Sequence, residues 1–218
     1  MKAFFFDMDG VLLDSLPHHI EAWTQTLGHY GIDFNARYCY LHEGMTSREI
    51  IRGLCQEQHV NITDHQLENI YEEKTAAYRL LGGGKPMANV DKVLDFLHNQ
   101  GIQIWVVTGG GQHDLYEQLE GFFPGIFHRD RMITARNTLH GKPAPDPYIA
   151  AWKKCGFSKE DCCVIENAPL GIRSGKAAGL QTLGVNSGAL TKEDLYEAGA
   201  DHVFANMQEL YDYLISVV

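Results

Sequence analysis

Short apolar runs separated by amphipathic stretches make up most of the chain. Five such runs, each three to six residues long and without regular polar alternation, lie at positions 3–6, 102–107, 162–165, 182–185 and 202–204. Runs of this kind are typical of parallel strands that are buried on both faces. Apolar residues recur at helical spacing over 89–99, 147–154 and 195–198. Strands that alternate with helices predict an α/β domain with a parallel sheet.

The region after the first strand departs from this alternation. Between positions 16 and 81 the sequence contains no convincing strand, and its apolar spacing predicts amphipathic helices over 20–30, 47–59 and 64–78. A glycine-rich tract at 82–86 ends this region with flexible residues. We therefore expect a helical insertion in the loop that follows the first strand.

This insertion divides the chain into two predicted domains. A core domain is expected from residues 1–15 and 86–218, and a helical domain from residues 16–85. Loops at the carboxyl ends of parallel strands are where α/β domains form their sites. We expect the helical domain to act as a lid over such a site and to move about hinges near 14–17 and 82–86.

The charge balance narrows the range of partners. The 218 residues include 18 Lys and Arg against 28 Asp and Glu, a formal net charge of −10. This balance disfavours nucleic acids and anionic membranes, which need a positive face. A small anionic substrate is still compatible with it, because a bound metal and a few lysines can reverse the sign locally. We expect a monomer or weak oligomer without a nucleic-acid or membrane partner.

Cysteine usage and hydropathy indicate a cytoplasmic protein. The five cysteines are odd in number and include no C-x-x-C spacing, which argues against a disulfide framework. Cys162 and Cys163 are neighbours in one strand and should face opposite sides of the sheet as apolar core residues. No apolar run approaches the roughly 20 residues of a membrane span, and the first strand follows Met1 without room for a signal peptide.

Two carboxylates follow the first strand directly. Asp7 and Asp9 come after an aromatic run and are followed by Gly10. A D-x-D pair alone is more often a solvated loop than a site, but this context is narrower. It resembles the first motif, D-x-D-G-x-[VT], of the haloacid dehalogenase (HAD) superfamily. The resemblance implies that Asp7 is a nucleophile that forms an aspartyl-phosphate and that Asp9 is the general acid and base, with Mg²⁺ bridging Asp7, the Asp9 carbonyl and a phosphate oxygen.

Three further motifs follow in the order of that superfamily. Thr108 ends the second strand, and its hydroxyl with the backbone N–H of Gly109 would bind phosphoryl oxygens. Lys142, between Gly141 and a proline, would neutralise the nucleophile and the transferred phosphoryl group. Each signal is weak alone, since glycine-rich strand ends and surface lysines are common. Together and in order they identify the chain as a member of the superfamily.

The fourth motif resembles that of the β-phosphoglucomutase-like subgroup. Its usual Glu-Asp pair is Glu166-Asn167 in this sequence. The resemblance implies that both are metal ligands, and an Asn can still offer its carbonyl oxygen to Mg²⁺. One formal negative charge is nevertheless missing. The implied fold is an α/β Rossmann-like HAD core with a parallel sheet and a helical (C1-type) cap inserted after the first strand.

The start of the second cap helix distinguishes members of the subgroup. A K-G-x-S-R loop of the mutases would place its Lys at Glu43 and its Arg at Ser47, with Arg48 one residue out of register. An anion beside a bisphosphate site disfavours that ligand. Glu43 could instead supply the charge that Asn167 lacks, as an extra metal ligand. This pairing resembles the inorganic pyrophosphatase branch, in which His19 and Lys74 would contact substrate.

We therefore expect a Mg²⁺-dependent HAD phosphohydrolase that acts through an aspartyl-phosphate, with inorganic pyrophosphate as the first substrate. The alternative is a β-phosphoglucomutase or a sugar-phosphate phosphatase. A haloacid dehalogenase is disfavoured because that chemistry needs neither Asp9 nor a metal. A non-catalytic scaffold of the same fold is disfavoured because such a protein would be expected to lose Asp7 or Lys142, and both are present.

Overall fold

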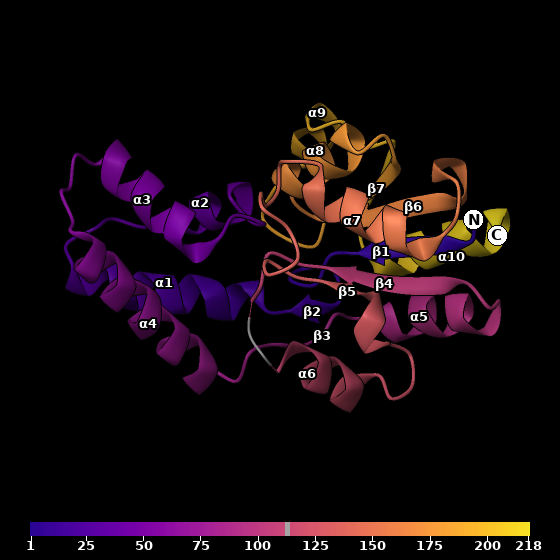
Figure 1. The fold of residues 1–218 in the computed structure, drawn as a ribbon, viewed down its shortest axis with the longest axis horizontal. Helices are drawn as coiled ribbons and strands as arrows, with labels where there is room; N and C mark the ends of the chain where they lie inside the picture. The colour runs from indigo at the N-terminus through magenta and orange to yellow at the C-terminus, as the bar shows by residue number, and fades with distance from the viewer. Residues whose placement is uncertain (112–113) are drawn as a thin grey trace.

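A six-stranded parallel sheet forms the centre of the larger lobe in the computed structural model, which describes residues 1–111 and 114–218 (Figure 1). Its strand order is β5-β4-β1-β6-β7-β8. The strands are β1 (Ala3–Phe6), β4 (Gln103–Val107), β5 (Met132–Ile133), β6 (Cys162–Glu166), β7 (Gln181–Val185) and β8 (His202–Phe204). The five predicted strands are confirmed, and the parallel α/β class with them. The two-residue β5 was not predicted because it is too short to carry an apolar run.

Helices cover both faces of this sheet. On one face lie α5 (Val90–Asn99), α6 (Leu115–Phe122) and α10 (Met207–Val217), and on the other lie α7 (Asp146–Cys155) and α8 (Pro169–Ala177), with α9 (Lys192–Glu197) packed beside α8 (Figure 1). The predicted helices at 89–99, 147–154 and 195–198 correspond to α5, α7 and α9. Helices α6 and α10 were not predicted.

Successive side chains of β1 point to opposite faces of the sheet. Because helices cover both faces, every residue of the strand is apolar. Phe4 and Phe6 pack in the cluster beneath α5 and α10, whereas Ala3 and Phe5 pack in the cluster beneath α7. Cys162 and Cys163 are likewise divided between the two faces, as predicted. All five cysteines are free and buried. A strand covered on both sides has no position where a polar side chain would reach water.

The smaller lobe contains α1 (Leu16–His29), α2 (Ala36–Leu41), α3 (Ser47–Glu57) and α4 (Asp64–Leu80), drawn in indigo and purple in Figure 1. It has a hydrophobic cluster of its own around Trp23, Leu27, Ile51 and Ile70. The absence of strands over 16–81 is confirmed for this region, every residue of which the structure describes. The helix α1 begins four residues before the predicted 20–30, and α2 was not predicted.

A short antiparallel pair joins the two lobes. The strands β2 (Leu13–Asp14) and β3 (Lys85–Pro86) pair Leu13 with Pro86 and Asp14 with Lys85. Gly84 has a φ of 94°, and a Cβ there would lie 2.8 Å from Ser15 Cα, so only glycine fits. The predicted hinge segments therefore lie side by side. Among the described residues, no helix has the length and apolar character that crossing a membrane requires.

The packing of β1 generates a stability prediction. Truncating Phe5 to Ala in the centre of the sheet should lower the free energy of unfolding by about 3–5 kcal/mol, because a fully buried ring is lost and a cavity is left. Urea denaturation of Phe5→Ala measures this loss. The matched control is Phe122→Ala on α6, whose residue is 41% exposed and whose truncation should cost far less. Equal losses in the two variants would contradict the role given to β1.

Candidate active site

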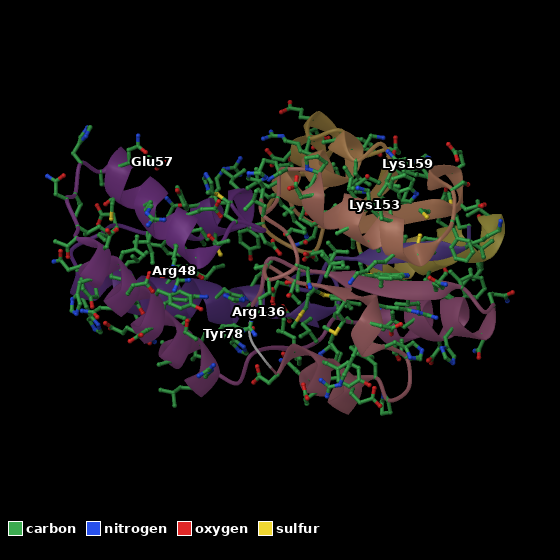
Figure 2. The ribbon with its side chains drawn as sticks, in the orientation of Figure 1. Arg48, Glu57, Tyr78, Arg136, Lys153 and Lys159 are labelled. Atoms are coloured by element: carbon green, nitrogen blue, oxygen red, sulfur yellow. The ribbon has the colours of Figure 1, made fainter. Side chains whose placement is uncertain are left out.

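A cavity of about 370 Å³ lies between the two lobes, at the carboxyl ends of β1 and β4. Its lining includes seven of the residues predicted for the site: Asp7, Asp9, Thr108 and Gly109 from the larger lobe and His19, Glu43 and Lys74 from the smaller one. Figure 2 shows Arg48, Tyr78 and Arg136 around the same space. The other three predicted residues, Lys142, Glu166 and Asn167, are buried and hydrogen-bonded to residues of the site.

Lys142 is the cation nearest to Asp7. Its ammonium group donates to the Asp7 carboxylate, to Glu166 Oε1 at 2.6 Å and to the Val107 carbonyl at 3.1 Å. The three acceptors come from the ends of β1, β6 and β4, which are adjacent in the sheet. Three donors on one ammonium group are thereby matched to three fixed oxygens, which sets the direction of the side chain.

Glu166 has every oxygen occupied within the protein. Its Oε1 accepts from Lys142 and from the Tyr148 hydroxyl at 2.7 Å, and its Oε2 accepts from the backbone N–H groups of Asn167 at 3.0 Å and Ala168 at 3.4 Å. A carboxylate offers about four lone-pair positions. Glu166 thus holds Lys142 in place, and this geometry does not favour the direct metal contact expected from the sequence.

The buried charges shift one another's pKa. Burial raises the pKa of Asp7 to about 8, with Lys142 opposing the shift and Glu166 and Asp9 adding to it. Burial alone would lower the pKa of Lys142, but Asp7 and Glu166 raise it overall, so its ammonium stays charged. One lysine facing two carboxylates leaves a net negative charge in a low-dielectric region. A further cation next to Asp7 would favour its ionised form.

Asp9 is ionised in this arrangement. Although burial alone would raise its pKa, hydrogen bonds from His19 and Ser15 and the charges of His19 and Lys74 lower it to about 2. Ser15 Oγ donates to Asp9 Oδ1, and His19 Nε2 lies 3.5 Å from the same oxygen. Asp9 therefore has a polar environment distinct from that of Asp7, two residues away.

His19 and Lys74 form one unit on the cap side of the cavity. The Lys74 Nζ lies 2.7 Å from His19 Nδ1, and the His19 ring stacks on Tyr78 at a centroid distance of 4.0 Å. Burial lowers the pKa of Lys74 to about 8, against the opposing effect of Asp9. Burial and the Lys74 charge also lower the pKa of His19. The two predicted substrate contacts are thus brought together and turned toward Asp9.

The loop at the start of α3 lies directly against the larger lobe. A Cβ on Gly109 would lie 2.8 Å from the Gly44 carbonyl oxygen, and a Cβ on Gly44 would lie 2.9 Å from Lys142 Cδ. Thr108 Oγ1 accepts from the Gly110 backbone N–H at 2.9 Å, so the loop after β4 is tightly turned there. Glycines at these positions allow the two lobes to meet over the cavity.

Glu43 and Asn167 meet across this contact. Asn167 Nδ2 donates to Glu43 Oε2 at 2.9 Å. Gly10 has a φ of 77°, and a Cβ there would lie 2.1 Å from the same Nδ2, so the glycine of the first motif makes room for the asparagine. The pKa of Glu43 is raised well above its ordinary value by burial and then by the charges of Asp7 and Glu166. The structure thus brings together the two residues that the sequence paired on charge grounds.

Two oxygens here fit a metal ion. Within residues 1–111 and 114–218, Glu43 Oε1 and Asn167 Oδ1 are buried without a hydrogen-bond partner. Such atoms are costly unless something binds them. Carboxylate and amide oxygens suit Mg²⁺. In the same described ranges, no three His, Cys, Asp or Glu side chains converge as a metal cluster, so the predicted ligand set depends on Asn167 and on the Asp9 main chain.

The sequence did not identify several residues of this site, among them Ser15 and Tyr78. Tyr148 holds Glu166 from α7, Arg48 lines the cavity although it is one residue out of register with the mutase pattern, and Arg136 lines it from the connection between β5 and α7. Tyr148 lies six residues after Lys142 in the same motif run. An aromatic residue on the first turn of that helix was the available signal, whereas Arg136 lies in a connection without periodicity.

Gly171 generates a prediction about Glu166. A Cβ on this α8 residue would lie 1.8 Å from Glu166 Oε1. Replacing Gly171 with Ala should therefore displace Glu166, lower the unfolding free energy and reduce any activity that depends on Lys142, despite the better helix propensity of Ala. The control is Gly121→Ala in α6, where a Cβ meets no atom within 4 Å and a gain of up to about 1 kcal/mol is expected. Chemical denaturation of both variants checks the contrast, and stabilisation in both would contradict it.

Three kinds of known protein are similar to this chain: a hydrolase family, curated phosphatases and solved structures. Residues 1–179 match the family described as hydrolase, haloacid dehalogenase-like hydrolase. The chain is 30% identical over 182 residues to fructose-1-phosphate phosphatase YqaB of Escherichia coli, covering 83% of this chain and 94% of that protein. It is 28% identical over 220 residues to "Putative pyrophosphatase PpaX" of Clostridium perfringens, covering 97% and 96%.

A solved structure is similar over almost the whole chain. It is described as "Putative beta-phosphoglucomutase from Bacteroides vulgatus", with a TM-score of 0.93, 37% identity, and coverage of 99% of this chain and 88% of that one. These similarities, together with the strand order of the sheet, confirm the family, the fold and the hydrolase class that the sequence predicted. The chain belongs to the haloacid dehalogenase-like hydrolase family.

Proposed function

We propose that the protein hydrolyses small phosphorylated molecules through a covalent phosphoryl intermediate on Asp7. The observation that carries the proposal is the meeting of Asp7, Asp9 and Lys142 around the buried end of one cavity. A carboxylate held by a charged lysine, beside a second carboxylate in a different environment, provides a nucleophile and an acid–base group.

In the first step, an Asp7 oxygen attacks the phosphorus atom, and the bond from phosphorus to the leaving oxygen breaks. The Lys142 ammonium offsets the charge on Asp7 and on the transferred group. Thr108 and the Gly109 N–H, both at the cavity wall, would bind the phosphoryl oxygens. The leaving oxygen takes a proton from Asp9. Because the Asp9 pKa is about 2 in the free protein, this role requires the phosphoryl dianion beside it to raise that pKa.

In the second step, water attacks the aspartyl-phosphate and Asp9 accepts a proton from it. The ionised carboxylate found here is already in the correct state for this base role. The bond between Asp7 and phosphorus then breaks, which returns the Asp7 carboxylate and releases phosphate. His19 and Lys74 contact Asp9 and the cavity from the cap side, and we assign them to contacts with the leaving group.

Mg²⁺ is the cofactor that fits the donor set. We assign it to Asp7, the Asp9 carbonyl, Asn167 and Glu43, and we give Glu166 a positioning role in its place because its oxygens are occupied. When bound, the ion would neutralise charge on the phosphoryl oxygens and lower the Asp7 pKa. This assignment gives a partner to Glu43 Oε1 and Asn167 Oδ1, two of the buried oxygens that have none among the described residues.

Phosphorylated carbohydrates are the substrate class that we favour. The fructose-1-phosphate phosphatase and the structure described as a β-phosphoglucomutase both carry sugar phosphates in their names. A cavity of about 370 Å³ lies within the range of small-molecule sites. Sugar phosphates, which were the alternative substrates predicted from the sequence, therefore rank above inorganic pyrophosphate, which was the first choice. Hydrolysis is favoured over the mutase reaction because Glu43 lies at the position of the mutase lysine.

Pyrophosphate remains a second candidate on one observation, the hydrogen bond between Glu43 and Asn167. An additional anionic ligand strengthens the hold on a cation, which in turn suits a compact and highly charged substrate. Phosphate release from pyrophosphate, sugar phosphates and polyol phosphates, each with and without Mg²⁺, would rank the two classes. No release from any of them would instead favour the non-catalytic scaffold.

Asp7→Asn tests the covalent step. The amide is a poor nucleophile, so phosphate release in the presence of Mg²⁺ should fall by at least about 10³-fold while the fold survives. Circular dichroism and the urea midpoint report the fold. Asp212→Asn on the outer face of α10 removes the same charge outside the cavity and should leave the rate unchanged. Activity of Asp7→Asn within tenfold of the parent protein would refute the mechanism.

Glu43→Gln tests the metal assignment. Calorimetry should show weaker Mg²⁺ binding. The value of kcat/KM should also fall, by an amount that corresponds to a loss of about 2–4 kcal/mol of transition-state stabilisation. Glu57→Gln, at the exposed end of α3, is the matched control and should bind Mg²⁺ normally (Figure 2). Adding Asn167→Asp to Glu43→Gln restores the missing charge and should recover binding. Additive effects of the two changes would mean that the residues do not share a metal ion.

A further inference from the structure

Arg136 has no part in the proposed reaction, yet it lines the same cavity. It lies in the connection between β5 and α7, on the side of the larger lobe. Figure 2 shows it between the two lobes, facing the region of Tyr78 on α4. The residue is exposed, in contrast to Asp7, Lys74 and Lys142, which are buried. Arg136 therefore marks the open end of the cavity.

Hydrogen bonds on both sides of Arg136 hold its backbone in place. The Asn137 side chain accepts from the Thr134 N–H at 2.8 Å and from the Thr134 hydroxyl at 3.0 Å. The N–H of Arg136 donates to Thr134 Oγ1 at 3.4 Å, and the N–H of Ala135 donates to the Gly110 carbonyl at 3.2 Å. The last bond ties this connection to the loop that carries Thr108. The position of Arg136 is thus fixed relative to the phosphoryl end of the site.

A second arginine lines the cavity from the smaller lobe. Arg48 lies over the Tyr71 ring at 4.0 Å, and it donates from Nε and Nη2 to the two carboxylate oxygens of Glu68 at 2.8 and 2.6 Å. These contacts hold its guanidinium on the cavity wall. Its side chain is 41% exposed, so it also belongs to the open end. Each lobe thus contributes one arginine there.

Charge is graded along the cavity. At the buried end the acidic lining residues Asp7, Asp9 and Glu43 outnumber the one lining lysine, Lys74, whereas the described charged residues at the exposed end are Arg48 and Arg136. The chain as a whole has a net charge of −10 and repels anions at long range. Arg136 brings a guanidinium group to the place where the distal part of a substrate would lie, and Arg48, held by Glu68, lines the opposite lobe there. Guanidinium groups match carboxylates and phosphates in geometry as well as charge.

We propose that Arg136 is a specificity-determining residue that, facing Arg48, binds a second anionic group on the substrate. The substrate class is then a phosphorylated carbohydrate with a carboxylate or a second phosphate at the end remote from Asp7. This inference rests on the proposed function, because it takes the phosphoryl group to be bound at Asp7. It adds a requirement at the far end of the molecule that the reaction itself does not impose.

Two substrates matched except for the distal group provide the test. 6-Phosphogluconate and sorbitol 6-phosphate are open-chain hexose derivatives that differ in a carboxylate against a hydroxymethyl group. The parent protein with Mg²⁺ should prefer the carboxylate by at least about tenfold in kcat/KM. In Arg136→Gln this preference should fall by about tenfold or more, mainly through KM for 6-phosphogluconate, while sorbitol 6-phosphate changes little. Arg136→Lys should keep part of the preference, since the charge remains.

Arg129→Gln is the matched control. Arg129 lies just before β5, seven residues from Arg136, is exposed, pairs with Glu117 and is absent from the cavity lining. It should leave the preference unchanged. A parent protein without preference for the carboxylate, or an unchanged preference in Arg136→Gln, would overturn the proposal.

Binding measurements without turnover distinguish a failure of this inference from a failure of the proposed function. Calorimetry on Asp7→Asn compares the affinities of the two compounds without turnover, and Arg136→Gln in that background should remove the difference. If neither compound is hydrolysed by the parent protein, a tenfold binding preference that depends on Arg136 still supports the inference, and its absence overturns it. The proposed function itself fails only if no phosphate compound of the wider panel is hydrolysed in an Asp7-dependent manner.

Discussion

A buried lysine must be surrounded by acceptors, and this requirement at Lys142 organises the structure. Its ammonium group is shared by Asp7, Glu166 and the Val107 carbonyl, which lie at the ends of three adjacent strands. Removing one partner of such a cluster leaves a charge uncompensated in the interior. The order β4-β1-β6 is therefore the arrangement that brings these oxygens to one point. Tyr148 and Gly171 then follow as the residues that support Glu166 from α7 and α8.

The second constraint is the close contact between lobes. Glu43 and Gly44 reach the larger lobe at Asn167, Gly109 and Lys142, and two of these contacts leave no space for a Cβ. The buried end of the cavity is closed by the backbone contact of Gly109 with Gly44 and by the side chains of Glu43, Asn167 and Lys142. The residue to which we assign substrate discrimination, Arg136, lies at the open end instead.

The sequence predicted β1, β4, β6 and β7 well because they are largely buried on both faces and consist mostly of apolar residues, and it also found the partly exposed edge strand β8. It failed for β5 and α2, which have two and six residues and carry no full period. Helix α10 was missed although Met207, Leu210 and Leu214 are spaced for one face. The motif residues converge as expected, because parallel strands bring their carboxyl ends to one edge. Partners such as Tyr148, and cavity positions such as Arg48, depend on helix placement, which local sequence does not specify.

The pairing of β2 with β3 has a consequence for how the protein folds and varies. The chain leaves the larger lobe at Asp14 and returns at Lys85, and these two residues are neighbours across one ladder. The ends of a long insertion thus meet as closely as the ends of a tight hairpin. Closure entropy grows only with the logarithm of the insertion's length. The register of β1 with β4 is therefore independent of how many helices the intervening segment contains. The same sheet can accept smaller or larger lobes at this point, so that the lobe could be exchanged during divergence while the catalytic strand ends stay fixed.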